Sequence, residues 1–243
     1  MNLTVDIGNT YIKTCVFNDD KVIRQDAFTS DLLFNLEHLF SSFPDIDNII
    51  VSSVRKDDKL IVPYFSQKKN LKKFILLDEN TPLPIKNKYE SKKTLGKDRI
   101  ALAVGANALY PGENLLIVDC GTAITFDIVD KNNAYLGGNI SPGIDMRFKA
   151  LNRFTQRLPL VDKSENFSLI GKTTKEAIEN GVVNGIIYEI QGYIASIIAE
   201  YSDIKVILTG GDANFFDKKL KNTIFVVLNL IPIGLNRILE YND

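Results

Sequence analysis

The sequence predicts an α/β protein built from two halves of the same plan, each with a mixed sheet flanked by helices. Two observations indicate this plan. Three short strand-like segments joined by turns open the chain, and the same pattern returns near its middle, each time followed by helical and strand-like segments. A matched pair of short motifs, Asp6-Ile7-Gly8-Asn9-Thr10 and Asp119-Cys120-Gly121-Thr122-Ala123, stands at the first turn of each pattern. We therefore expect halves at residues 1–112 and 113–243, the alternative being one mixed domain with hairpins that are alike by chance.

The first half is expected to begin with strands and to continue with helices and strands in turn. Leu3, Val5 and Ile7 alternate with polar neighbours, which is the two-residue period of a half-buried strand. Between Asp31 and Phe43 the apolar residues recur with the helical period instead. The expected strands are 3–7, 11–17, 21–28, 46–54 and 74–77, the expected helices are 31–43, 57–67 and 97–110, and 78–95 is expected to be an ordered loop.

The second half repeats the three strands and adds a long helix. Six residues four or three apart place one apolar face along 174–201: Ile178, Val182, Ile186, Ile190, Ile194 and Ile197. Its polar residues, among them Glu179 and Asn180, argue against a membrane span. The expected strands are 115–119, 124–129, 134–140 and 204–208, and further helices are expected after Pro142-Gly143 and at 235–241.

The bulk composition is that of a soluble globular protein. Of the 243 residues, 45% are apolar and 24% are charged, and the formal net charge is −1. This balance predicts neither a nucleic-acid partner nor a membrane partner. The start of the chain lacks the basic and apolar regions of a signal peptide, so a cytoplasmic location is expected. Cys15 and Cys120 lie in apolar runs and are expected to be reduced core residues.

The two matched motifs have the chemistry of a phosphate site. Glycine lets backbone N–H groups approach a phosphate closely, and an aspartate offers oxygen ligands to a cation or to its waters. One Asp-x-Gly is weak evidence, but two at equivalent places predict a pair of hairpins that bind a nucleotide's phosphates. No P-loop motif is present in the sequence. A third element, Leu208-Thr209-Gly210-Gly211-Asp212, is either a site for adenine or a plain turn.

These three motifs, in this order, resemble the superfamily of actin, the sugar kinases and the heat-shock ATPases, which implies a duplicated ribonuclease H-like fold. Four further segments narrow the resemblance to type III pantothenate kinases over nearly the whole chain. They are Gly96-Lys97-Asp98-Arg99, Gly137-Gly138-Asn139-Ile140-Ser141-Pro142-Gly143, Leu158-Pro159 and Thr173-Thr174-Lys175-Glu176-Ala177-Ile178. One departure is Lys97, where the family commonly has a small residue. It should be tolerated if the side chain points to solvent.

The resemblance implies an enzyme that phosphorylates pantothenate with ATP, the first step of coenzyme A synthesis. It implies Asp98 as the catalytic base and Asp119 as the ligand of an activating K⁺ or NH₄⁺, with Mg²⁺ accompanying ATP. It also implies a homodimer. The implied ATP-binding residues are Asp6, Ile7, Gly8, Asn9, Thr10, Tyr11, Ile12, Lys13 and Thr122, and the implied substrate-binding residues are Tyr89, Gly96, Lys97, Asp98, Arg99 and Thr174.

Each of these residues also has a purely structural interpretation. Asp98 could simply favour a helix dipole, Arg99 could form a surface salt bridge, Tyr89 could pack its loop, and Thr174 could be a helix N-cap. Two other functions also remain open. One is a non-catalytic nucleotide-binding regulator of the same fold, which need not keep Asp98. The other is a phosphotransferase or phosphatase acting on acetate, a sugar or polyphosphate.

Overall fold

The computed structural model describes residues 1–55, 61–68, 70–201 and 203–243 of the chain. The chain forms two compact units. The first comprises residues 1–111, 133–135 and 229–243, and the second comprises residues 112–132 and 136–228. The C-terminal segment, residues 229–243, therefore belongs with the first unit although it lies at the opposite end of the chain. The division into functional halves at residues 112 and 113 remains a prediction.

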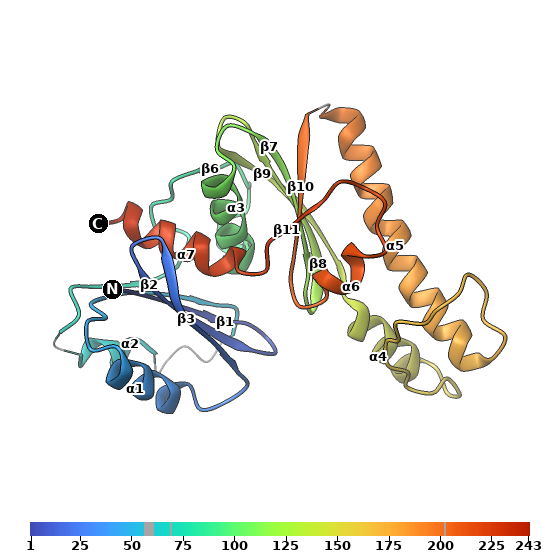
Figure 1. Ribbon diagram of the computed structural model, residues 1–243, viewed down its shortest axis with the longest axis horizontal. Helices are drawn as coiled ribbons and strands as arrows, with labels where there is room; N and C mark the ends of the chain where they lie inside the picture. The colour runs from blue at the N-terminus through green and yellow to red at the C-terminus, as the bar shows by residue number, and fades with distance from the viewer. Residues whose placement is uncertain (56–60, 69, 202) are drawn as a thin grey trace. The chain divides into compact units, whose positions relative to one another are not determined.

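The first unit is built on a five-stranded sheet in the order β3-β2-β1-β4-β5, of which Figure 1 labels β1, β2 and β3. The strands are β1 (Asn2–Ile7), β2 (Ile12–Asn18), β3 (Lys21–Phe28), β4 (Asn48–Ser53) and β5 (Lys73–Leu76). β1 pairs antiparallel with β2 and parallel with β4, so the sheet is mixed. Odd-numbered residues of β1, such as Leu3 and Val5, are buried in one apolar cluster with residues of helices α1 (Leu32–Ser42) and α2 (Ile61–Ser66). Even-numbered residues therefore face the opposite side of the sheet.

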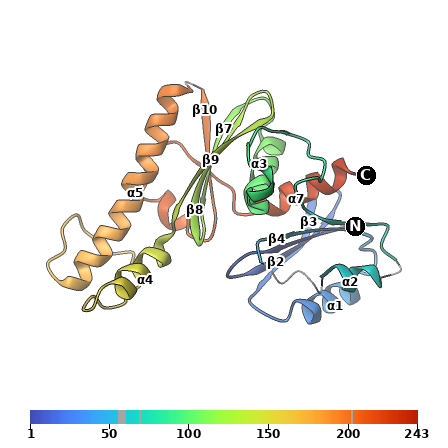
Figure 2. The same cartoon turned by 180° about the vertical axis from the view of Figure 1, so that it is seen from behind.

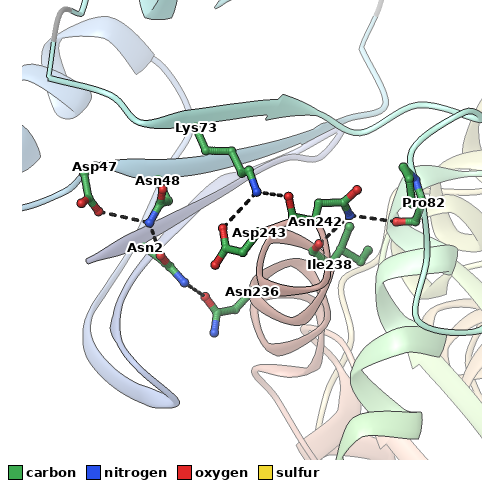
Figure 3. Close-up of polar contacts among 9 residues, drawn as sticks. All are labelled: Asn2, Asp47, Asn48, Lys73, Pro82, Asn236, Ile238, Asn242 and Asp243. Carbon is green, nitrogen blue, oxygen red and sulfur yellow. Dashed lines mark hydrogen bonds and ion pairs between the residues drawn. The ribbon is translucent and has the colours of Figure 1, made fainter.

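That opposite side is covered by α3 (Lys97–Leu109) and α7 (Leu230–Tyr241), which lie against each other (Figure 1). Figure 3 shows how polar side chains tie α7 to the sheet. Asn2 Nδ2 donates to Asn236 Oδ1 at 2.9 Å, and Lys73 Nζ pairs with Asp243 at 3.0 Å. The helix was expected to start at Leu235, but it starts at Leu230. Pro232 is tolerated because it lies in the first turn, where backbone N–H groups have no partner within the helix.

The second unit repeats this arrangement in a sheet of order β11-β10-β7-β8-β9-β6, of which Figure 2 labels β7, β8, β9 and β10. Its strands are β7 (Asn114–Cys120), β8 (Ala123–Asp130), β9 (Ala134–Pro142), β10 (Ile204–Thr209) and β11 (Phe225–Val226). β7 pairs antiparallel with β8 and parallel with β10, as β1 does with β2 and β4. The short strand β6 (Lys86–Asn87) pairs with residues 134 and 135, which count with the first unit. The predicted duplicated α/β fold is confirmed.

Helices α4 (Ile144–Phe154), α5 (Thr174–Glu200) and α6 (Ala213–Asp217) complete the second unit. The predicted apolar face of α5 is buried from Ile178 to Ile194, in one cluster with residues of β7, β8 and β10. By length and hydropathy alone α5 would pass as a membrane span, but its buried face packs as the core helix of a globular unit. Cys15 and Cys120 are buried and free, as predicted.

Several expectations about local structure need adjustment. The expected helix at 57–67 is observed as α2 from Ile61, and residues 56–60 lie outside the described part of the chain. The expected loop at 78–95 contains β6 and a 3₁₀ turn, η2 (Lys92–Thr94). The short elements α6 and β11 were not predicted, because five and two residues are too few to show a period.

Candidate functional site

The first unit brings Asp6 and Asp98 into electrostatic contact. Asp6 is the penultimate residue of β1 and lies on the sheet face that α3 and α7 cover, and its side chain is only 7% exposed. Asp98 lies in the first turn of α3. The pKa of Asp6 is raised to about 6, first by burial and then by the negative charge of Asp98, whereas Lys13 and the Ser52 hydroxyl act to lower it. Two neighbouring carboxylates of which one is hard to ionise are typical of a functional site rather than of a core.

Asp6 is also incompletely satisfied. Its Oδ1 atom and the Oγ atom of Ser52 are buried, and neither has a hydrogen-bond partner among the described residues. The two residues are paired across β1 and β4, so both side chains are on the same face. Ser52 lies near enough to influence Asp6 without a well-directed hydrogen bond. A buried carboxylate oxygen of this kind needs a donor or a cation, which a ligand would supply.

The raised pKa predicts that ionisation of Asp6 lowers the stability of the unliganded protein in a pH-dependent way. Because the folded pKa of about 6 lies above the ordinary value of 3.8, the fold binds the proton more tightly than the unfolded chain does. The free energy of unfolding therefore decreases, by up to about 3 kcal/mol, as the pH rises from the ordinary pKa of 3.8 through the folded pKa of about 6. Asp6→Asn should remove that loss and melt at a higher temperature than the wild type at pH 8 but not at pH 4, in thermal melts without nucleotide or Mg²⁺.

The matched control for this prediction is Asp31→Asn. Asp31 is exposed and has a left-handed backbone (φ 59°), a conformation that asparagine also adopts. Its replacement should leave the difference from the wild type independent of pH. If the melting temperatures of Asp6→Asn and the wild type depended on pH in the same way, ionisation of Asp6 would not be the cause of the lost stability.

The turn after β1 is held by backbone contacts. The Gly8 N–H donates to Tyr11 O at 3.0 Å, and the Val54 N–H donates to Ile7 O at 3.1 Å. Ile7 and Ile12 are buried core residues, whereas Asn9, Thr10 and Tyr11 are exposed. The predicted ATP-binding segment is therefore an accessible loop between two anchored strand ends.

The predicted substrate-binding residues of the first unit lie at or near the start of α3. Gly96 is the N-cap, and a side chain at this position would overlap the Asp98 carboxylate. Arg99 is 4% exposed, so the surface salt bridge considered for it is wrong. Its guanidinium lies 5.6 Å from the centre of the Tyr89 ring, which in turn lies 6.1 Å from the ring centre of Tyr135. Tyr89 and Arg99 are thus brought together beside Asp98.

Lys97 does not point freely into solvent. Its side chain is 18% exposed, and its ammonium lies 3.7 Å from Glu79. The departure from the family pattern at this position is accommodated by an ion pair with the preceding loop, so the helix start keeps its shape.

In the second unit, Asp119 occupies the same place in β7 that Asp6 occupies in β1. Burial raises the pKa of the adjacent Cys120 thiol, and the charges of Asp119 and Asp212 raise it further. Gly210 adopts φ +95°, and a side chain there would overlap Asp119 Oδ1 and the Cys120 backbone. Asp212 is paired with Lys163, so Asp119 is the carboxylate that the ends of β7 and β10 enclose beside Gly210, and it is the candidate ligand for a cation.

The motif at 137–143 supports the Thr122 loop. The Gly143 N–H donates to Thr122 O at 3.1 Å, and the Gly121 N–H donates to Ala123 O at 3.1 Å. Arg147 fastens the same region, since its Nε donates to Pro142 O at 2.8 Å. Among the described residues, no group of three or more His, Cys, Asp or Glu side chains is placed to hold a metal ion. A cation in either unit would therefore need backbone, water or phosphate oxygens as well.

Thr174 is exposed at the first position of α5 and is not its N-cap. The cap is Thr173, whose hydroxyl accepts from the Glu176 N–H at 3.2 Å. The Glu176 carboxylate accepts in turn from the Lys172 N–H at 2.7 Å. The contacts that fix this end of the helix are local, so the side chain of Thr174 is not needed to start α5.

Two residues near Asp6 escaped the sequence analysis. Ser52 and Arg55 follow the apolar core of β4, and Arg55 donates to backbone carbonyls of the turn after β1. The available signal was polar residues directly after a buried strand, since ligands of open α/β sheets bind at the carboxyl ends of the strands. That signal has no meaning until β4 is known to lie beside β1.

Comparison with known proteins identifies the family. The sequence model of type III pantothenate kinases matches residues 2–196. The chain belongs to the type III pantothenate kinase family. Curated members include one from Christiangramia forsetii, 44% identical with 100% of this chain and 99% of that protein covered, and one from Bacteroides fragilis (strain ATCC 25285), 43% identical with 100% and 99% covered.

Solved structures agree with this family at the level of the fold. A protein described as a conserved putative Baf family transcriptional activator from Campylobacter jejuni is 26% identical, with 99% of this chain and 98% of that chain covered and a TM-score of 0.64. A putative N-acetylmannosamine kinase from Listeria monocytogenes has a TM-score of 0.60 at 13% identity, with 100% and 99% covered. At that identity the likeness concerns the sugar-kinase fold alone.

Proposed function

We propose that this protein transfers the γ-phosphoryl group of ATP to pantothenate, giving 4′-phosphopantothenate for coenzyme A synthesis. The family membership of the whole chain supports this activity. The observation that carries it is the intact Gly96-Lys97-Asp98-Arg99 at the start of α3, with Asp98 next to the buried carboxylate of Asp6. A degenerate binding protein would have no need for this pair.

Asp98 is the group that takes the proton of the pantothenate hydroxyl. Its position in the first turn of α3 leaves it half-buried, and its Oδ1 accepts from the Arg99 N–H at 2.8 Å, which orients the carboxylate. Phosphoryl-transfer transition states are loose, so much of the benefit comes from orienting the attacking oxygen. Arg99 and Tyr89 bind the acceptor beside Asp98. In the second unit, Thr174 is a further residue that we assign to binding of the acceptor. The loop 8–11, Lys13 and Thr122 bind ATP.

Asp6 fits the Mg²⁺ that accompanies ATP. Its buried Oδ1, which has no hydrogen-bond partner in the described part of the chain, is the kind of hard oxygen that Mg²⁺ binds directly or through water. When bound, Mg²⁺ neutralises charge on the phosphates. Binding would also remove the electrostatic cost of ionising Asp6 next to Asp98. The pair is thus arranged for a cationic ligand.

The direct test is formation of 4′-phosphopantothenate by mass spectrometry, from folded protein with pantothenate, ATP, Mg²⁺ and K⁺. A coupled assay of ADP release with acetate and sugars as acceptors checks the competing phosphotransferase functions. Folded protein that releases no product with pantothenate would rule out the proposed activity. It would leave the regulatory alternative, which is the description carried by the Campylobacter jejuni relative.

A monovalent cation at Asp119 is the second part of the proposal. K⁺ or NH₄⁺ suits a site made of one carboxylate and backbone carbonyls, whereas Mg²⁺ requires tighter octahedral geometry. Replacing K⁺ with Na⁺ or Li⁺ at constant ionic strength should lower activity. Asp119→Asn should lose both activity and the response to K⁺, while the exposed Asp203→Asn keeps both. Equal wild-type rates in all three salts would instead make Asp119 a further ligand for the nucleotide's magnesium.

A cytoplasmic homodimer completes the proposal. Helix α5 keeps apolar residues exposed outside its buried face, including Tyr188 and Ile198. An added methyl group at Gly181 or Gly192 would meet no atom of the described residues of this chain within 4 Å. Such a surface suits close approach of a second helix. Light scattering at micromolar concentration should give twice the 27.2 kDa mass of the chain. A monomer would contradict this assembly.

A further inference from the structure

Arg55 contacts the turn that follows β1, although it belongs to none of the motifs identified in the sequence. Its Nε donates to Gly8 O at 2.8 Å, and its Nη2 donates to Asn9 O at 3.3 Å. Hydrogen bonds from a guanidinium are stronger than those between neutral groups, and its planar shape suits two acceptors at once. The side chain therefore holds two successive carbonyl groups of one loop.

The backbone that carries Arg55 is itself anchored. The Arg55 N–H donates to Ser53 Oγ at 3.2 Å, and the neighbouring Val54 N–H donates to Ile7 O at 3.1 Å. These contacts join the end of β4 to the end of β1. Arg55 thus reaches the loop from a fixed base rather than from a mobile surface segment.

Peptide geometry gives this contact a consequence for the loop. The described peptide bonds are trans, and in a trans peptide the C=O of one residue points opposite to the N–H of the next. With the carbonyls of Gly8 and Asn9 directed at Arg55, the N–H groups of Asn9 and Thr10 are directed the other way. Arg55 therefore sets the direction of the two peptide groups that join Gly8, Asn9 and Thr10, and backbone N–H groups of such turns can bind phosphate oxygens.

We propose that Arg55 is a positioning residue for the phosphates of the nucleotide. It orients the peptide groups on either side of Asn9, including the Asn9 N–H. It also restrains a glycine-containing loop whose freedom would otherwise be lost when the ligand binds, at a cost in entropy. The proposal rests on the proposed function only in placing a nucleoside triphosphate at this loop. The loop that Arg55 holds is proposed to bind the polyphosphate group of the nucleotide. The affinity for adenosine, which has no phosphates, should therefore not depend on Arg55.

Direct binding of ATP and of adenosine, measured by calorimetry with Mg²⁺ and no acceptor, tests this role. Arg55→Ala should weaken ATP binding about 10- to 100-fold, the loss expected for two charge-assisted bonds, and adenosine binding less than about threefold. Arg55→Lys should recover only part of the ATP affinity, because an ammonium cannot hold both carbonyls in one plane. Guanidinium ion added at millimolar concentration should partly restore ATP binding to Arg55→Ala.

The matched control is Arg24→Ala, which removes an exposed arginine of the same unit that pairs with Asp26 at 2.8 Å. It should bind both ligands as the wild type does. Unchanged ATP affinity in Arg55→Ala, or an equal loss of adenosine affinity, would overturn the proposal. If Arg55→Ala fails to fold, Arg55→Lys alone decides, by the loss of ATP affinity relative to the loss of adenosine affinity. Wild-type protein that binds ATP but does not phosphorylate pantothenate would defeat the proposed function and leave the role of Arg55 intact.

Discussion

Asp98→Asn is expected to lower kcat at least about 100-fold, which is the size of a general-base contribution, while the protein stays folded. The amide has the same shape as the carboxylate, and its oxygen can still accept from the Arg99 N–H, so the start of α3 should be preserved. What is lost is the group that takes the proton. Steady-state kinetics with saturating ATP and pantothenate, and circular dichroism, measure the two parts of this expectation.

A second readout separates catalysis from a structural role. The charge of Asp98 raises the pKa of Asp6, so Asp98→Asn should lower that pKa and weaken the loss of stability between pH 4 and pH 6. The control is Asp145→Asn, which removes the aspartate in the first turn of another helix, α4. If Asp98 only favoured a helix dipole, the two variants would behave alike. Turnover near the wild-type rate in Asp98→Asn would remove this residue from the mechanism.

Gly234→Ala is expected to destabilise the first unit by about 3 kcal/mol, the upper part of the range for overpacking. A methyl group at Gly234 would overlap Ala101 O and lie 2.8 Å from Gly105 N. Helices α3 and α7 thus meet backbone to backbone, with no flexible side chain to move aside. The helices would have to separate, and α3 carries Asp98 at its first turn. Thermal unfolding should show a melting temperature lower by about 6–12 °C.

Ala108→Gly is the matched control for this prediction. Ala108 is also within a helix of the first unit, α3, but it is exposed. Glycine should destabilise the helix there by about 1 kcal/mol, so at an exposed helix position a methyl group is favourable. A loss of stability in Gly234→Ala, which adds a methyl group, would therefore come from helix contact and not from helix propensity. A Gly234→Ala protein that melts at or above the wild-type temperature would disprove the close packing.

Local patterns were enough to predict most elements and the family. The alternation of Leu3, Val5 and Ile7 and the apolar face of α5 are repeated over several residues, so their periods are visible without a structure. The matched motifs at Asp6 and Asp119 could be paired because each ends the first strand of a three-strand run. A hypothesis about chemistry that depends on one short segment, such as the first turn of α3, could therefore be made from the sequence.

Tertiary structure alone decided which distant segments meet. Only the strand order places Ser52 beside Asp6, and only the anchoring of β4 brings Arg55 to the loop at Gly8. Packing likewise assigns α7, the last helix of the chain, to the sheet formed by the first strands. The buried state of Asp6 follows from the same packing. Periodicity reports how one segment divides its residues between core and solvent, whereas contacts between segments depend on strand order and on the shapes of the packed surfaces, which no local pattern contains.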